Sequence, residues 1–241
     1  MSGTAKTPTK ELIAQHVKTI VSNLIQPYIE RLAENIRRVI NLITLYQKTK
    51  GNKELISDPD DILRSAVVLL HASLEDFMRV LSAAILPTRG NEQLSSIPLV
   101  GKHDGTRPEK FSLAELAKHR GKTVDAVISE SVNSYLEKTS YNTITDVENT
   151  LRIMGIRPKD VKTHYSDLEE MMKRRHQIVH RADRIANIKG KELICGIDES
   201  KVINWVSSVI EFMQKVLLTY AVDESVNKIM KELERNIPKE A

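Results

Sequence analysis

The chain has 241 residues, a formal net charge of +4, a pI near 9.0 and an aromatic content of only 4%. It contains no apolar run near the ~20 residues that span a bilayer, and its first ten residues have no signal-like hydrophobic stretch. The single cysteine, Cys195, excludes an internal disulfide and fits a reducing compartment. We therefore predict a soluble, cytoplasmic protein without a membrane partner, whose mild positive charge permits an anionic partner without requiring one.

The N-terminal fifth of the chain predicts one very long helix. Residues 1–9 have no apolar pattern and are expected to be disordered, whereas apolar residues recur every three or four positions over residues 11–48. Pro27 should kink or split this helix. Because a small core cannot cover so long a stripe, the helix must wrap the domain or pair with a second copy. We expect a helical extension over residues 1–50, a candidate dimerisation element, and a helical domain over residues 51–241.

The rest of the chain alternates helical patterns with turn signals. After a linker, Asp58 and Pro59 mark the start of a helix over Asp60–Leu86, and residues 87–110 read as an exposed loop. Further helices are predicted over Thr123–Leu136, Thr143–Met154, Ser166–Asn187 and Val202–Ala221.

Local signals mark where several of these elements begin. Ser112 and Ser166 open capping boxes, Asp198 caps the Val202–Ala221 helix, and Asp223 is expected to open a separate, charged terminal helix. Only Lys191–Gly196 hints at a strand, which is too short to set the fold class. The pattern predicts an all-α helical bundle whose core is formed by residues 60–86, 166–187 and 202–221.

One segment, residues 168–183 (LEEMMKRRHQIVHRAD), carries candidate chemistry. On a helical wheel Arg175 falls on the apolar stripe, where a guanidinium is costly unless an anion meets it. His176 and His180 lie one turn apart on an adjacent face, with Asp183 three residues further. A buried-side arginine beside two stacked histidines is the first feature that indicates a function rather than a scaffold.

This segment resembles the catalytic helix of the HEPN superfamily, whose signature is an Arg, a polar residue, and a His separated from the Arg by four to six residues. Here it reads Arg175-His176-Gln-Ile-Val-His180. The spacing alone is not specific, because it also occurs twice elsewhere, at Arg64…His71 and Arg157…His164. Two further stretches, residues 66–79 (AVVLLHASLEDFMR) and residues 140–155 (SYNTITDVENTLRIMG), resemble the RiboL-PSP branch.

The resemblance, which spans about residues 60–221, implies a HEPN-like up-and-down helical bundle acting as a metal-independent RNA endonuclease, a hydrolase without a cofactor. It implies a homodimer with a composite active site, used in toxin or antiviral defence systems, with an antitoxin or defence-system partner. His180 would shuttle a proton at the ribose 2′-OH and Arg175 would stabilise the phosphate. His176 would hold the phosphate or the neighbouring chain, or only supply polarity. Arg174, Arg181 and Arg184 would contact the RNA backbone.

Each candidate also has a structural interpretation. Arg175 could pair with Glu75 or Asp76, carboxylates that could equally tether Arg79. His180 could be an ordinary helix histidine, and Tyr141 could stack on a base. The His176–His180 pair could bind a metal, but it lacks the Glu of an H-E-x-x-H motif, so we predict no metal site.

Two alternative functions follow from the same sequence. Many HEPN folds are non-catalytic RNA-binding or assembly modules, and the long N-terminal helix could serve such a role. A purely structural helical adaptor would make the Arg-His match accidental.

Overall fold

A computed structural model describes residues 10–51, 58–100, 113–186 and 192–236 of the protein, so the expected disorder of residues 1–9 and the predicted Ser112 cap lie outside the description. The main helices are α1 (Lys10–Thr49), α2 (Asp60–Ile85), α5 (Val124–Lys138), α6 (Ile144–Ile153), α7 (Tyr165–Arg181) and α8 (Glu199–Asn236). Shorter elements are the helices α3 (Asn91–Leu94) and α4 (Leu113–Ala117), and the strands β1 (Arg184–Ala186) and β2 (Glu192–Ile194). None of the described helices is long and apolar enough to cross a membrane.

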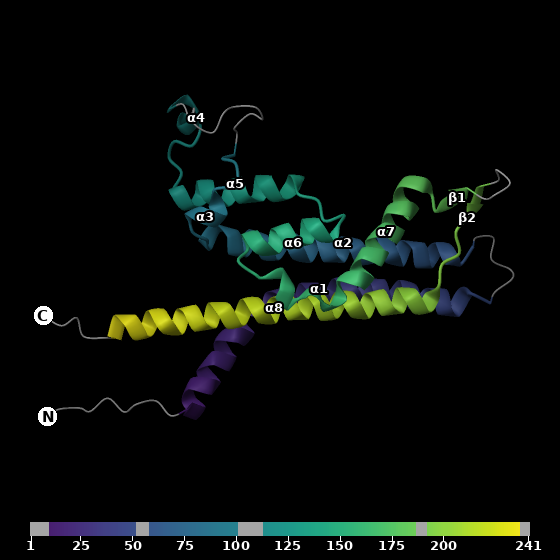
Figure 1. The fold of residues 1–241 in the computed structure, drawn as a ribbon, viewed down its shortest axis with the longest axis horizontal. Coiled ribbons are helices and arrows are strands. Elements are labelled where there is room, and N and C mark those ends of the chain that lie inside the picture. Colours follow the sequence, from purple (N-terminus) through teal and green to yellow (C-terminus); the bar gives the residue numbers. More distant parts are fainter. Residues whose placement is uncertain (1–9, 52–57, 101–112, 187–191, 237–241) are drawn as a thin grey trace, which may run out of the picture.

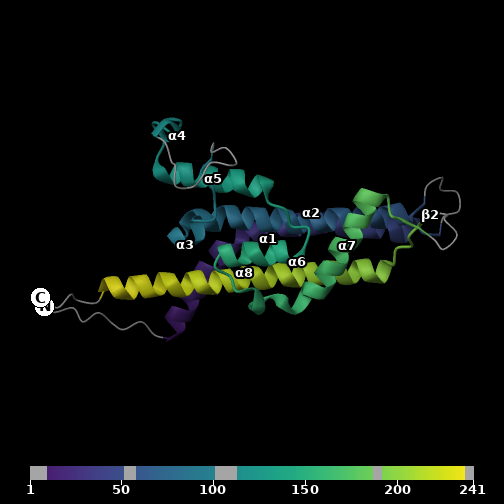
Figure 2. The same ribbon diagram turned by 45° about the horizontal axis from the view of Figure 1, so that its top comes forward.

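The predicted all-α, up-and-down bundle is confirmed. Helices α1, α2 and α8 run along the long axis of the molecule, with α7 crossing them obliquely (Figure 1). The view in Figure 2 shows α5 stacked on the outer side of α2. Helix α2 lies at the centre, because it packs against α1, α5, α6, α7 and α8 and has buried residues along its whole length.

Helix α1 is continuous through Pro27, and its N-terminal part leaves the bundle at a steep angle to the rest (purple in Figure 1). A proline removes one helix hydrogen bond and favours a bend at that place. The second half of α1 packs into the core through Leu32, Ile36, Val39 and Ile43. The predicted domain boundary at residue 50 therefore falls between two helices that share one core.

The predicted helix starts at Thr123 and Thr143 and the predicted cap at Asp198 are confirmed. The side chain of Thr123 accepts a hydrogen bond from the Ala126 amide at the start of α5, at 3.2 Å. Thr143 and Asp146 form a reciprocal capping box at α6, and Asp198 accepts from the Lys201 amide near the start of α8 at 3.1 Å.

The predicted limits of α7 are wrong at both ends. The helix begins at Tyr165, so Ser166 lies inside it and forms no cap. It ends at Arg181 rather than Asn187, because Ala182 (φ 48°) and Asp183 (φ 58°) take the left-handed conformation that terminates a helix. The chain then enters β1, which pairs antiparallel with β2, so the strand suggested by Lys191–Gly196 is confirmed.

Two other expectations are corrected. Helix α8 runs without a break through Asp223 to Asn236, so no separate terminal helix begins there. A change from apolar to charged residues does not end a helix when no Gly or Pro intervenes. The segment after α2, expected to be a loop, contains a 3₁₀ turn at Leu86–Thr88 and the short helix α3.

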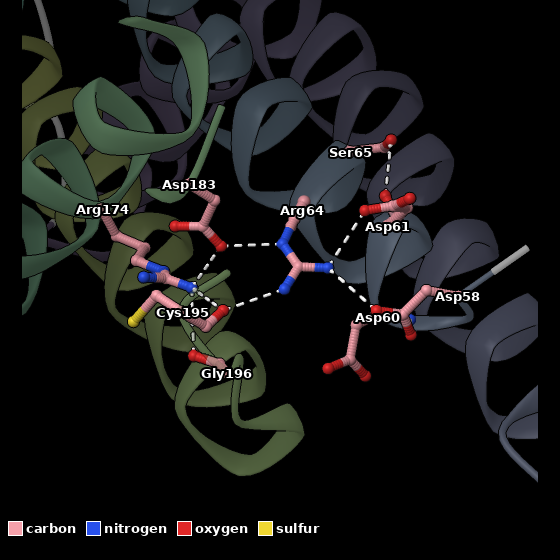
Figure 3. A network of polar contacts seen from close by, with 9 residues as sticks. All are labelled: Asp58, Asp60, Asp61, Arg64, Ser65, Arg174, Asp183, Cys195 and Gly196. Atoms are coloured by element: carbon pink, nitrogen blue, oxygen red, sulfur yellow. Dashed lines mark hydrogen bonds and ion pairs between the residues drawn. The ribbon is translucent and has the colours of Figure 1, made fainter. Parts of the chain in front are cut away.

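A buried ion-pair network joins α2 to the end of α7 (Figure 3). Arg64, 7% exposed, donates from Nε to Oδ2 of Asp183, 1% exposed, at 2.7 Å. The same carboxylate oxygen accepts from Nη2 of Arg174 at 2.6 Å. Both guanidinium groups also donate to the Cys195 carbonyl, and Arg174 reaches the Gly196 carbonyl as well. We call Arg64, Asp183 and Arg174 the arginine clasp; it fixes α7 to α2 and to the segment leading into α8.

The clasp yields a stability prediction. Removing one partner of a buried ion pair typically costs about 3–5 kcal/mol, so Arg64→Ala should lower the free energy of unfolding by about 3 kcal/mol or more. Arg31→Ala is the matched control, because Arg31 pairs with Asp76 at 2.6 Å but its side chain is 57% exposed. Surface pairs contribute about 0–1 kcal/mol. Urea unfolding followed by circular dichroism should separate the two variants, and equal losses would contradict a stabilising clasp.

Candidate active site

The polar side chains in the second half of α7 differ in how far they are buried. Its first turns are anchored in the core by Leu168, Met171 and Met172. Arg174 and Arg175 follow and are half-buried, whereas His176 and His180 are exposed. Arg175, predicted to lie on the apolar stripe where a core residue is expected, is thus half-buried rather than fully buried.

The Arg175 guanidinium is held by an amide rather than by an acid. Its Nη1 donates to Oδ1 of Asn142 at 3.2 Å, and its Nε is buried without a hydrogen-bond partner in the described part of the chain. The suggested pairing with Asp76 is wrong, because Asp76 binds Arg31 and Asn35. Among the described residues no carboxylate lies within ion-pair distance of Arg175, so its charge is free to meet an external anion.

The two histidines lie side by side on the outer surface of α7. The ring centroids of His176 and His180 are 4.5 Å apart, and the ring planes are inclined at 43°. Because both residues are exposed, their nitrogens are accessible to a substrate on the same side of the helix. The one-turn spacing thus produces the ring pair expected from the sequence.

The three arginines predicted to bind RNA have different surroundings. Arg181 and Arg184 are exposed, at the end of α7 and in β1. Arg174 is turned inward and contributes to the arginine clasp, so its placement does not favour a phosphate contact. Tyr141 is fully buried, with Arg79 5.3 Å from its ring centroid, so the suggested stacking of this ring on a base is wrong.

The structure distinguishes the three Arg-His spacings. Arg64 and His71 are both buried in α2 and engaged in internal contacts. On the surface, Arg157 pairs with Asp160 at 2.8 Å, and His164 lies 3.4 Å from Glu211. The Arg175…His180 pair differs from both, since it combines an arginine free of carboxylates with an exposed histidine.

A family model described as RiboL-PSP-HEPN matches residues 30–218, which is more than half of the chain. The protein belongs to this HEPN family. The match extends from the core half of α1 into α8 and encloses α7. No curated protein and no solved structure gives a significant match. Membership of the HEPN family is consistent with a ribonuclease or another RNA-related function.

Two residues near the candidate site, His71 and Asn142, were missed by the sequence reasoning. His71, 1% exposed on α2, lies with Nε2 3.1 Å from the Tyr141 carbonyl. A carbonyl only accepts hydrogen bonds, so Nε2 carries the proton and donates. The sequence signal that could have identified His71 is its position among the apolar residues of α2. Asn142 is exposed, and nothing in the sequence singles it out.

Within the described residues no group of three or more His, Cys, Asp or Glu side chains is placed to hold a metal ion. His176 and His180 are therefore a pair without a third side-chain ligand in this part of the chain.

His71 gives a pH-dependent prediction. Burial lowers the pKa of His71 below 6.5, with Glu75 opposing this shift and Arg175 adding to it. The unfolded chain then binds a proton at His71 more readily than the folded protein does. The free energy of unfolding therefore falls as the pH drops below about 6.5 toward the pKa of His71 in the folded protein. The slope is at most about 1.4 kcal/mol per pH unit. His71→Gln cannot titrate and should lack this component. The difference in unfolding free energy between wild type and His71→Gln should therefore shrink with falling pH; a constant difference would contradict the assignment.

Proposed function

We propose that the protein is a metal-independent endoribonuclease of the kind used in toxin and phage-defence systems. The observation that carries the proposal is the combination on α7 of Arg175, which has no carboxylate partner in the described structure, and His180, which is exposed on the same helix. The HEPN family match supports an RNA substrate. A general acid–base group and a fixed positive charge are the two elements that phosphodiester cleavage by an internal hydroxyl requires.

In this mechanism the imidazole of His180 accepts the proton of a ribose 2′-OH or returns one to the leaving 5′-oxygen. The 2′-oxygen forms a bond to phosphorus while the bond from phosphorus to the 5′-oxygen breaks. Arg175 stabilises the negative charge that builds up on the phosphoryl oxygens. His176, adjacent to His180, holds the phosphate or a neighbouring chain, and the exposed Arg181 and Arg184 bind flanking phosphates.

A single copy of α7 exposes its histidines on one open surface, and we propose that a second copy completes the site. Val179, which lies in α7 between the two histidines, is 46% exposed. The adjoining strands also carry exposed apolar residues, at Ile185, Leu193 and Ile194. An apolar patch beside a polar site favours contact with a protein surface, and in a two-fold dimer the same patch serves both copies. An antitoxin or defence-system partner is a further proposal for this surface.

The chemical prediction uses single substitutions on α7. His180→Ala should lower the cleavage rate by about 10²–10⁴, the usual contribution of one general acid–base group, and Arg175→Ala should cost a comparable factor. Products should carry a 2′,3′-cyclic phosphate and a 5′-hydroxyl, and EDTA should not change the rate. Purified protein incubated with total RNA, followed by end-group analysis, measures all three.

Unchanged melting temperatures would place these losses in the site rather than in the fold. RNA binding by His180→Ala should persist, because the exposed Arg181 and Arg184 still supply permanent positive charge for the phosphates. If the wild type binds RNA without cleaving it and Arg175→Ala weakens binding, the protein is instead a non-catalytic RNA-binding HEPN module. Cleavage by His180→Ala at the wild-type rate would refute the assignment of His180.

The assembly prediction concerns Val179. Light scattering should report a dimer at micromolar concentration, and Val179→Asp should shift it toward monomer because a carboxylate would be placed in an apolar contact. Val124→Asp is the matched control, since Val124 is 75% exposed but lies on α5, away from α7. A wild-type monomer, with and without RNA, would count against the composite site.

A further inference from the structure

We infer that Asn142 and His71 are positioning residues that fix the Arg175 guanidinium for an RNA phosphate. This inference rests on the proposed function and extends it to residues outside α7. It starts from the contact between Asn142 Oδ1 and Arg175 Nη1, 3.2 Å long, which links the segment before α6 to α7.

The chemistry of Asn142 suits an orienting role. An amide oxygen accepts a hydrogen bond from a guanidinium without cancelling its charge, whereas a carboxylate would neutralise it. Asn142 is exposed, yet its backbone is fixed on both sides. The preceding residue, Tyr141, is fully buried, and the following residue, Thr143, is locked in the α6 capping box. The Asn142 side chain thus extends from a rigid base.

His71 secures that base from within the core. Its Nε2–H donates to the Tyr141 carbonyl at 3.1 Å, one residue before Asn142. A continuous path therefore runs from α2 through His71, the peptide at Tyr141 and the Asn142 amide to Arg175. Burial keeps the pKa of His71 low, so the path adds no second positive charge behind the guanidinium. Interactions of this kind hold a catalytic group in place and reduce the reorganisation needed during reaction.

A merely structural role would give a different result from positioning, and a double-mutant cycle separates them. Asn142→Ala should lower kcat about 10-fold with KM changed less than about threefold, because the Arg175 charge acts mainly in the transition state. In an Arg175→Ala background the same substitution should cost less than about twofold. Asn149→Ala is the matched control, since Asn149 accepts a similar bond from Arg152 on the surface of α6. Equal losses from Asn142→Ala in both backgrounds would overturn the inference.

His71 is tested by a pair of variants. His71→Gln retains a side-chain N–H that can reach the Tyr141 carbonyl, and it should keep kcat within about threefold of wild type. His71→Leu removes the donor and should lower kcat about 10-fold at a temperature where both variants are folded. Equal kcat values for the two variants would remove His71 from the path.

A spectroscopic measurement keeps this inference separate from the proposed function. The ¹⁵N relaxation of the Arg175 Nε–H group, assigned by its absence in Arg175→Ala, reports order of the side chain whether or not RNA is cleaved. Asn142→Ala should lower that order and Asn149→Ala should not. Unchanged order in Asn142→Ala would overturn the inference, whereas lowered order in a protein that does not cleave RNA would support positioning while refuting the ribonuclease.

Discussion

The site on α7 depends on the arginine clasp. The last turn of a helix lacks intrahelical partners for its carbonyl groups and tends to fray, and His180 lies in this turn. Beyond it, Asp183 brings its carboxylate back between Arg64 and Arg174, while its backbone amide donates to the Gln177 carbonyl at 3.2 Å. The clasp thus ties the end of α7 to the start of α2 and to the segment before α8. Without the clasp, the last turn of α7, which carries His180, would lose these tertiary contacts and fray more easily.

Two consecutive arginines on α7 differ in whether their charge is compensated, because different groups contact them. Arg174 binds the Asp183 carboxylate, which compensates its charge inside the protein. Arg175 binds the Asn142 amide, which orients it and leaves its charge uncompensated. The sequence does not distinguish the two positions, because both are arginines and they are adjacent. Burial does not distinguish them either, because both side chains are half-buried. The contact partner, a carboxylate for Arg174 and an amide for Arg175, makes the first arginine structural and leaves the charge of the second available for a ligand.

This difference explains what the sequence could predict. Helix starts at Thr123, Thr143 and Asp198 depend on groups within three residues of each other, so local patterns identify them. The end of α7 depends on Asp183, whose partner Arg64 is 119 residues away. No local pattern contains that contact, so the C-terminal end of the helix was predicted six residues too far along the chain. The sequence analysis missed Asn142 for the same reason, because the residue that it contacts, Arg175, is 33 positions further along the chain.

His176 and His180 lie on an exposed surface of α7, and this exposure limits how one chain alone could hold a phosphate. Arg175 supplies one guanidinium per chain, whereas a pentacoordinate phosphate spreads charge over several oxygens and needs contacts from more than one direction. In the proposed dimer, a two-fold axis near the exposed Val179 would bring both copies of the polar surface together. Each chain would then fix its own arginine through internal contacts and share only the outer cleft. In the proposed dimer, the guanidinium would be positioned before the two chains associate, and the dimer would decide the access of RNA to both histidine pairs.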